Sequence, residues 1–321
     1  MKNTRHKTPG ITNNPSSERG FSLIEMMISV TIGMLIIAAL VGVMTSNSRA
    51  AKSNDRTSEL QSNGRYALNQ LKREVRLASY RGYTWAEPTN PPTTAIAPPS
   101  GECLPAGGTA GSFATNIRQG IWGANDSNPF PANCLNGRYA SDDVLVVRRT
   151  GDQTATALTA NAFYFRSSYA IGEMFQGTAP PTIAGSPVAN FPVLEYVYYI
   201  GTDDTDATLP ALRRIALLSD GTMGDEMVVS RIEHMQLQYG RATTDLNTQY
   251  YDADGITGTS TDPLPTDWDD VDSVRIWLLA RNAQIEPGYT NTNTYDMGDQ
   301  SFTPNDGFRR QLFTAVVQLR N

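Results

Sequence analysis

Histidine and cysteine are scarce in this sequence, with two of each among its 321 residues. His6 lies near the N-terminus, and His234 lies in a segment that alternates polar and apolar residues, where a structural or exposed position is expected. The sequence also lacks an H-E-x-x-H zinc motif, a G-x-S-x-G nucleophile elbow, a P-loop, a C-x-x-C pair and a dinucleotide-binding fingerprint. We therefore expect a protein that is not an enzyme and that holds no metal and no cofactor.

Basic residues are in the minority. The 26 Lys and Arg residues against 32 Asp and Glu residues give a net charge of −6. A dedicated nucleic-acid-binding protein would be expected to show a basic balance, so no nucleic-acid partner is expected. Aromatic residues such as Phe163, Tyr164 and Tyr198 could form a stacking surface for single strands or glycans. In an acidic chain, packing in the core or on a sheet face is the better interpretation.

Long apolar runs are absent except for one, Phe21 to Met44, which contains no proline and a single charge, Glu25. A helix of this length spans roughly 36 Å, enough to cross a hydrocarbon core of about 30 Å. The run is too long for the apolar core of a cleaved secretory signal, and no A-x-A pattern follows it. The stretch before it is basic, which predicts that residues 1–20 stay in the cytoplasm and that the chain after Met44 is exported. The basic residues of that stretch are Lys2, Arg5, Lys7 and Arg19.

The segment Arg19-Gly20-Phe21-Ser22-Leu23-Ile24-Glu25 resembles the prepilin signal of type IV pilins and type II secretion pseudopilins. The resemblance implies that residues 1–20 are a leader, that prepilin peptidase cuts after Gly20, and that Phe21 becomes the N-methylated terminus. The apolar helix would stay on the mature protein. Ser22 stands where the family most often has threonine, which is also a small hydroxyl residue.

Glu25 matches the glutamate that this family carries five residues into the mature chain. A carboxylate near the centre of a membrane helix costs about 2.5–3.5 kcal/mol, and less near the end, so it calls for a partner. Cleavage would give Phe21 a free amine, and the two charges attract strongly where the dielectric constant is low. We expect Glu25 to pair with the amine of Phe21, on a neighbouring subunit or on the same chain, and so to guide assembly.

No proline occurs between Pro15 and Pro88, so a continuous helix from Phe21 to about Tyr80 is allowed. We expect a transmembrane and assembly part over 21–45 and an amphipathic part over 46–80 that packs on the body of the protein. Gly64 lies on the apolar stripe and would permit close packing. The stripe, at spacings of three or four, consists of Leu60, Gly64, Ala67, Leu71, Val75 and Ala78.

Residues 85–137 are rich in proline and glycine and predict an irregular excursion rather than a buried element. This region holds both cysteines, Cys103 and Cys134. An exported location favours a disulfide between them, and two free thiols are the alternative. The bridge would close a loop of about 31 residues and contribute roughly 3–4 kcal/mol in the chain-entropy model.

Beyond this region the pattern predicts strands at 143–148, 193–200, 231–239, 271–281 and 312–320, whereas 211–218 is ambiguous and favours a strand through its flanking turn residues. Turns are predicted at Asp220-Gly221, Asp254-Gly255 and Asp306-Gly307. One long helix followed by many strands predicts an α+β, pilin-like fold, with the helix packed on a largely antiparallel β-sheet head over 81–321. Asp252-Ala-Asp254-Gly255 is interpreted as a hairpin turn, with a calcium site in the Asp-rich stretch 252–272 as the alternative.

Three segments of the head, Ser141–Val147, Val271–Arg281 and Phe308–Asn321, resemble the PilW family of type IV pilus minor pilins. The resemblance implies a structural subunit that helps to prime pilus assembly in a complex with other minor pilins, at or near the filament tip and in contact with the major pilin. It also implies an inner-membrane protein with a periplasmic head that later reaches the pilus and the cell surface. Two alternatives stay open: a J-type pseudopilin of type II secretion, and a tip module for adhesion or DNA uptake that uses region 85–137.

Overall fold

The structure is a computed structural model that describes residues 20–89, 92–113, 116–131, 134–135, 137–242, 247–259 and 267–320. The basic residues of the predicted leader and Asp262 of the Asp-rich stretch lie outside these ranges. The chain divides into two units between Asp55 and Arg56.

One long helix, α1, runs from Leu23 to Arg76. The prediction of a continuous helix is confirmed, although the helix ends at Arg76 and not near Tyr80. Ser79 adopts a left-handed φ of 65°, and its N–H donates to the carbonyl of Arg148 at 3.1 Å. The last predicted turn is thus replaced by a hydrogen bond to a strand, which redirects the chain away from the helix axis.

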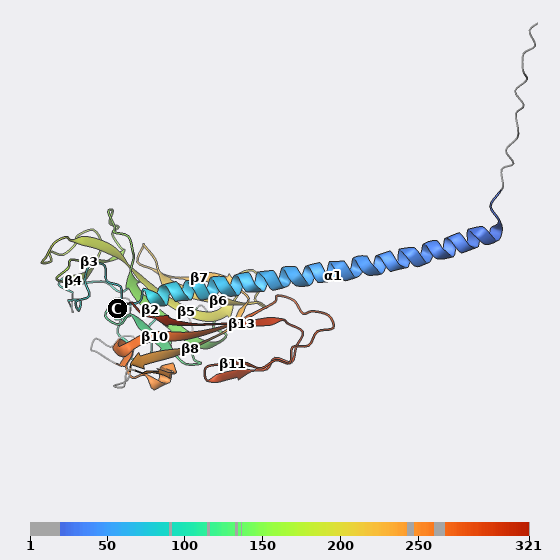
Figure 1. The fold of residues 1–321 in the computed structure, drawn as a ribbon. Helices are drawn as coiled ribbons and strands as arrows, with labels where there is room; N and C mark the ends of the chain where they lie inside the picture. Colours follow the sequence, from blue (N-terminus) through green and yellow to red (C-terminus); the bar gives the residue numbers. More distant parts are fainter. Residues whose placement is uncertain are drawn as a thin grey trace, which may run out of the picture. The chain divides into compact units, whose positions relative to one another are not determined.

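The rest of the described chain is rich in β-structure. The strands are β1 (Ile121–Ala124), β2 (Ser141–Thr150), β3 (Phe163–Ser167), β4 (Gly172–Gln176), β5 (Ala189–Thr202), β6 (Pro210–Leu217), β7 (Met223–Ser230), β8 (Ile232–Ala242), β9 (Thr248–Tyr251), β10 (Val271–Arg281), β11 (Tyr295–Met297), β12 (Gln300–Phe302) and β13 (Arg310–Gln318). Two short 3₁₀ helices lie at Ala253–Gly255 and Asp267–Asp270. Figure 1 shows these strands gathered beside the later part of α1.

The strands form three sheets, and all pairings between them are antiparallel. The 7-stranded sheet has the order β1-β2-β5-β3-β4, with β6 paired to β5 and β7 paired to β6. The 4-stranded sheet has the order β13-β10-β8-β9, and β11 and β12 form a 2-stranded sheet. The predicted α+β class with a largely antiparallel sheet is confirmed. The ambiguous segment 211–218 is a strand, β6, because it has β5 on one side and β7 on the other.

The six stripe residues predicted on the amphipathic part of α1 are all buried. At Gly64 an added Cβ would lie 2.1 Å from Cε2 of Phe313 on β13. Because the aromatic ring fills the space that a side chain would need, glycine lets helix and sheet approach closely at this point. The predicted role of Gly64 in close packing is confirmed.

Region 85–137 is not the unburied excursion that its composition predicts. It contributes β1, which pairs with β2, and several side chains of the main hydrophobic core. These are Cys103, Phe113, Ile121, Trp122, Phe130 and Leu135. The prolines and glycines prevent regular structure over most of the region, but widely spaced aromatic and aliphatic side chains still reach the core. A periodic pattern cannot reveal them because they do not share one element.

The turn predictions have mixed outcomes. Asp220-Gly221 forms the β6–β7 turn, with φ +81° at the glycine. The hairpin interpretation of Asp254-Gly255 is wrong, because these residues belong to a 3₁₀ helix that follows β9. Asp306-Gly307 precedes β13, whose partner is β10 and not the preceding strand, so it is a connection between sheets and not a hairpin turn.

Candidate functional site

The residues at the start of α1 are the first candidate site. Ser22 precedes the helix, and its carbonyl accepts the N–H groups of Glu25 and Met26 at 3.0 and 3.1 Å. The Glu25 side chain turns back, and its Oε2 accepts the N–H of Ser22 at 3.4 Å. This is one half of a capping box, in which a glutamate at the third helical position satisfies the backbone donor of the capping residue. Glu25 is therefore held near the backbone of Phe21, the residue expected to carry the new amine.

Sequence reasoning assigned Glu25 a charge partner but missed this capping contact. The signal was present, since Ser22 and Glu25 have the S-x-x-E spacing of a capping box. A carboxylate in the first turn also interacts favourably with the positive end of the helix dipole. Glu25 thus stabilises the start of α1 before any partner subunit is present.

The first half of α1 exposes its apolar side chains. In the described part of the chain, α1 is the helix that is long and apolar enough to cross a membrane by length and composition. Three of its hydroxyl groups are satisfied within the helix, because Ser29, Thr31 and Thr45 donate to carbonyls of their own helix at 2.7–3.0 Å. A hydroxyl paired in this way does not need water, which suits a helix that lies in lipid or against other helices.

The second half of α1 is joined to the head by a buried ion pair. Nε of Arg149 on β2 lies 2.7 Å from Oε2 of Glu74, and both side chains are almost completely buried. Nη1 of Arg149 also donates to the carbonyl of Thr150 at 3.0 Å. The pair fixes the position of the helix along β2, because an unpaired charge at this depth would be costly.

The neighbouring Arg148 points into a different part of the core. Its Nε lies 2.6 Å from Oε1 of Glu195 on β5 and 3.1 Å from the carbonyl of Phe113, and its Nη1 donates to the carbonyl of Gln119 at 3.1 Å. Burial raises the pKa of Glu195, and the charge of Arg148 opposes that rise. Arg148 therefore holds Phe113 and Gln119 of the irregular region against the sheet.

A disulfide ties the same region together. Cys103 and Cys134 are bonded, with their Cα atoms 5.3 Å apart. Cys103 is buried in the main core beside the region's aromatic residues. The covalent bond and the Arg148 contacts together hold a segment that has little regular structure of its own.

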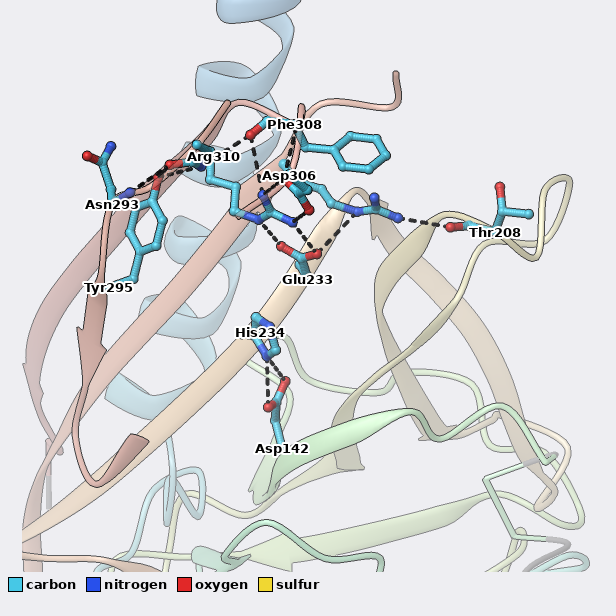
Figure 2. Close-up of polar contacts among 11 residues, drawn as sticks. Asp142, Thr208, Glu233, His234, Asn293, Tyr295, Asp306, Phe308 and Arg310 are labelled. Atoms are coloured by element: carbon cyan, nitrogen blue, oxygen red, sulfur yellow. Dashed lines mark hydrogen bonds and ion pairs between the residues drawn. The ribbon is translucent and has the colours of Figure 1, made fainter. Parts of the chain in front are cut away.

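Figure 2 shows a second polar cluster, where β8 and β13 approach the connection before β13. The Nη2 atom of Arg310 lies 3.0 Å from Oε1 of Glu233 and 2.8 Å from Oδ2 of Asp306. Arg281 lies 3.5 Å from Glu233 and donates to the carbonyl of Thr208 at 2.9 Å. The bond from Arg310 lowers the pKa of Asp306. These contacts fix residues 306–310 to the 4-stranded sheet.

His234 and two aspartates connect the two larger sheets. Nδ1 of His234 on β8 lies 3.0 Å from Oδ1 of Asp142 on β2 (Figure 2). The imidazole also packs on the ring of Phe302, with the ring centroids 4.5 Å apart. Asp143 is buried and accepts the N–H groups of Leu237 and Asp126 at 2.7 and 3.0 Å. Burial raises the pKa of Asp143 to about 8. Of the two positions expected for His234, structural or exposed, the structure shows the structural one.

Several carboxylates in the described part of the Asp-rich stretch have protein partners. Asp252 accepts from Gln238 at 2.9 Å, and Asp267 and Asp270 lie 3.2 and 3.1 Å from nitrogens of Arg241. Over the described ranges, no group of three or more His, Cys, Asp or Glu side chains is arranged to hold a metal ion. In that part of the chain the aspartates serve to fix β8 and its neighbouring 3₁₀ helix.

The predicted site residues therefore fall into two places. Gly20, Phe21 and Glu25 lie together at the start of α1, and the bonded pair Cys103–Cys134 lies in the head. The charged residues that organise the head were not predicted, because no local pattern marks a charge that is buried by tertiary contacts. They are Glu74, Arg148, Arg149, Glu195, Glu233 and Arg310.

Two known families match this chain, one near its N-terminus and one over its C-terminal part. The prokaryotic N-terminal methylation motif matches residues 15–41, and the family described as type IV pilus-assembly protein W matches residues 197–321. Among solved structures, a type IV-like pilin from Thermus thermophilus matches with 14% identity and a TM-score of 0.32, covering 83% of this chain and 95% of that one. Comparison with curated proteins gives no match.

The methylation motif, the apolar first half of α1 and the antiparallel head define a type IV pilin-like protein. Its C-terminal part carries the PilW domain, and the chain resembles the PilW minor pilins. The motif implies processing by prepilin peptidase and assembly with other pilins. Pilins and PilW proteins are structural, and the polar clusters of the head act here as structural contacts.

Proposed function

We propose that this chain is a minor pilin that helps to prime type IV pilus assembly, within a complex of minor pilins at or near the filament tip. Its partners are other minor pilins and the major pilin. Before assembly it is anchored once in the inner membrane with its head in the periplasm. It then becomes part of the pilus at the cell surface.

The observation that carries this proposal is the start of α1. The large apolar side chains of residues 21–44 are more than half exposed, so they need lipid or other helices around them. Glu25 is fixed within the first helical turn, beside the bond that prepilin peptidase would cut. Cleavage would place an ammonium at Phe21, and Glu25 of the same or a neighbouring subunit could then neutralise it.

Two variants of Glu25 test the charge pair against the capping role. Glu25→Gln keeps a side-chain acceptor for the N–H of Ser22 but removes the charge, whereas Glu25→Ala removes both. We expect both variants to be cleaved after Gly20, and both to be depleted about tenfold or more from sheared filaments, a factor that corresponds to about 1.4 kcal/mol. Mass spectrometry of the mature N-terminus and immunoblots of sheared filaments would measure the two steps.

The outcomes are distinguishable. If only Glu25→Ala is depleted, capping and not charge is what assembly requires. If both variants enter filaments normally, Glu25 has no role in assembly. If the N-terminus is Met1 or lies beyond Met44, in cells with an active prepilin peptidase, the pilin function itself is refuted.

Deletion of the whole chain distinguishes a role in type IV pilus assembly from a role in type II secretion or in binding at the pilus tip. A minor pilin that primes assembly predicts a large loss of surface pili with normal protein secretion. Loss of secretion with normal pili would instead indicate a pseudopilin. Normal pili with lost adhesion or DNA uptake would indicate a tip-binding module.

A further inference from the structure

A cleft with a volume of about 620 Å³ lies in the head, beside the segment that follows α1. Four segments that are far apart in the sequence form its walls: 79–87, 118–121, 268–271 and 319–320. Small-molecule sites in proteins usually have volumes of roughly 300–1,000 Å³, so this cleft is large enough for a ligand. It lies apart from the prepilin-type start of α1 and from the polar clusters of the head.

The wall formed by residues 79–87 is held in place by the protein itself. The N–H of Tyr83 donates to Oγ of Ser167 at 2.9 Å, and the ring of Tyr83 packs edge to face on Phe191, with centroids 5.3 Å apart. Gly82 has a φ of +70°, and an added Cβ would lie 2.5 Å from the same phenylalanine ring. A wall that is already ordered lowers the entropic cost of binding a ligand.

Trp85 is the exposed aromatic residue of this wall. Its side chain lines the cleft and is 91% exposed, and in the described part of the chain no large hydrophobic side chain is more exposed. Single exposed hydrophobic residues are common on protein surfaces. Trp85, however, shares the cleft with three further aromatic residues, Tyr80, Tyr83 and Trp268. Aromatic walls of this kind are typical of small-molecule sites.

Charged side chains of both signs line the same cleft. They are Arg81, Glu87, Arg118, Asp269 and Arg320. Nε of Arg118 lies 2.9 Å from Oε2 of Glu87, and Nη1 of Arg81 lies 3.5 Å from Oε1 of Glu87. The Glu87 side chain is nevertheless 64% exposed. Because a carboxylate has about four acceptor sites, Glu87 can accept hydrogen bonds from a ligand while it keeps both arginines.

This pairing of charges favours a neutral ligand. A phosphate group or a nucleic-acid strand would meet the carboxylates of Glu87 and Asp269, and the arginines beside Glu87 are already neutralised. A cationic ligand would meet Arg118 and Arg320. A sugar ring avoids both conflicts. Its hydroxyl groups can donate to a carboxylate and accept from a guanidinium, and its C–H face can pack on the electron-rich face of an indole.

We propose that this cleft binds a neutral glycan, with one sugar ring stacked on Trp85 and its hydroxyl groups bonded to Glu87 and Arg118. This inference goes beyond the minor-pilin function and does not depend on it. The whole cleft belongs to the unit 56–321, so glycan binding makes no use of the apolar first half of α1.

An array of oligosaccharides tests the site with the full-length protein, in a detergent that has no sugar headgroup. The array carries neutral hexose and N-acetylhexosamine oligomers, sialylated and sulfated oligosaccharides, and single-stranded DNA. We expect the protein to bind a neutral oligosaccharide, whose affinity is then measured by titration calorimetry. Trp85→Ala should weaken this binding about tenfold or more, because it removes a large aromatic contact. Glu87→Ala should also weaken it.

Two variants serve as controls. Trp85→Tyr keeps an aromatic face at the same position and should retain most of the affinity. Tyr66→Ala removes an aromatic residue that is exposed on α1 and does not line the cleft, and it should bind like the wild type. Trp85→Ala should keep the melting temperature of the wild type, because the indole is almost fully exposed.

The proposal is overturned if no neutral oligosaccharide of the array binds, or if Trp85→Ala leaves the affinity unchanged. A preference for the sialylated or sulfated oligosaccharides, or for DNA, would also overturn it, because an anion would then be the ligand. We expect cells with Trp85→Ala to be fully piliated. Loss of their pili, with no glycan bound by the wild type, would assign the cleft to a contact between subunits instead. Deletion of the whole chain tests the minor-pilin function separately.

Discussion

The ion pair between Glu74 and Arg149 offers a direct test of how α1 is held on the head. The side chains of the two residues are 3% and 4% exposed, and the charged atoms lie 2.7 Å apart. Glu74→Leu would leave the guanidinium of Arg149 buried without its carboxylate partner, while its Nη1 still donates to the carbonyl of Thr150 at 3.0 Å. Removing one partner of a buried pair costs about 3–5 kcal/mol.

A loss of this size is measurable. For a domain of about 200 residues, 1 kcal/mol shifts the melting temperature by roughly 2–4 °C, so Glu74→Leu should lower it by about 10 °C. Thermal unfolding of the full-length protein in detergent micelles, followed by near-ultraviolet circular dichroism, would report on the head.

The double variant Glu74→Leu with Arg149→Met provides the control. It replaces both charges with apolar side chains of similar volume, and such replacements are often neutral or stabilising. We expect it to recover most of the stability lost in Glu74→Leu. The reasoning is refuted if Glu74→Leu costs less than about 1 kcal/mol, or if the double variant loses the sum of the two single losses.

Three further predictions concern the head. Gly64→Ala should destabilise it by about 1–3 kcal/mol, because the added Cβ would lie 2.1 Å from the ring of Phe313, and Phe313→Leu should restore part of the loss in chemical denaturation. Cys103→Ser with Cys134→Ser should cost about 3–4 kcal/mol in the same assay, and an unchanged denaturation midpoint would exclude a stabilising role for the bridge. Burial raises the pKa of Asp143 from 3.8 to about 8, so the unfolded chain releases this proton at lower pH than the folded chain. The contribution of protonated Asp143 to the free energy of unfolding is therefore fully present below pH 4, and it is lost as the pH rises to about 8. Asp143→Asn should flatten the stability profile over that window, and an unchanged slope would count against the shift.

Sequence pattern alone was sufficient to locate the helices and strands whose apolar residues recur at a regular spacing. The buried stripe from Leu60 to Ala78 follows a period near 3.6, and β10 follows a period of two, so both could be located from spacing alone. The end of α1 could not, because a hydrogen bond from Ser79 to a strand 69 positions later decides it. Nor could the core role of Phe113 and Trp122, because they lie in a region without periodicity.

The sequence by itself determined the single long apolar run, the prepilin-type start with Glu25, and the order of one long helix followed by many strands. These are properties of consecutive residues, whose hydrophobicity and spacing act locally. Only the tertiary structure decided which charges are buried in pairs and which strands lie at the edges of the sheets. Burial of Glu74 depends on Arg149, and the exposure of β13 depends on the order of strands in its sheet. Both depend on contacts between residues far apart in the chain, which local spacing does not encode.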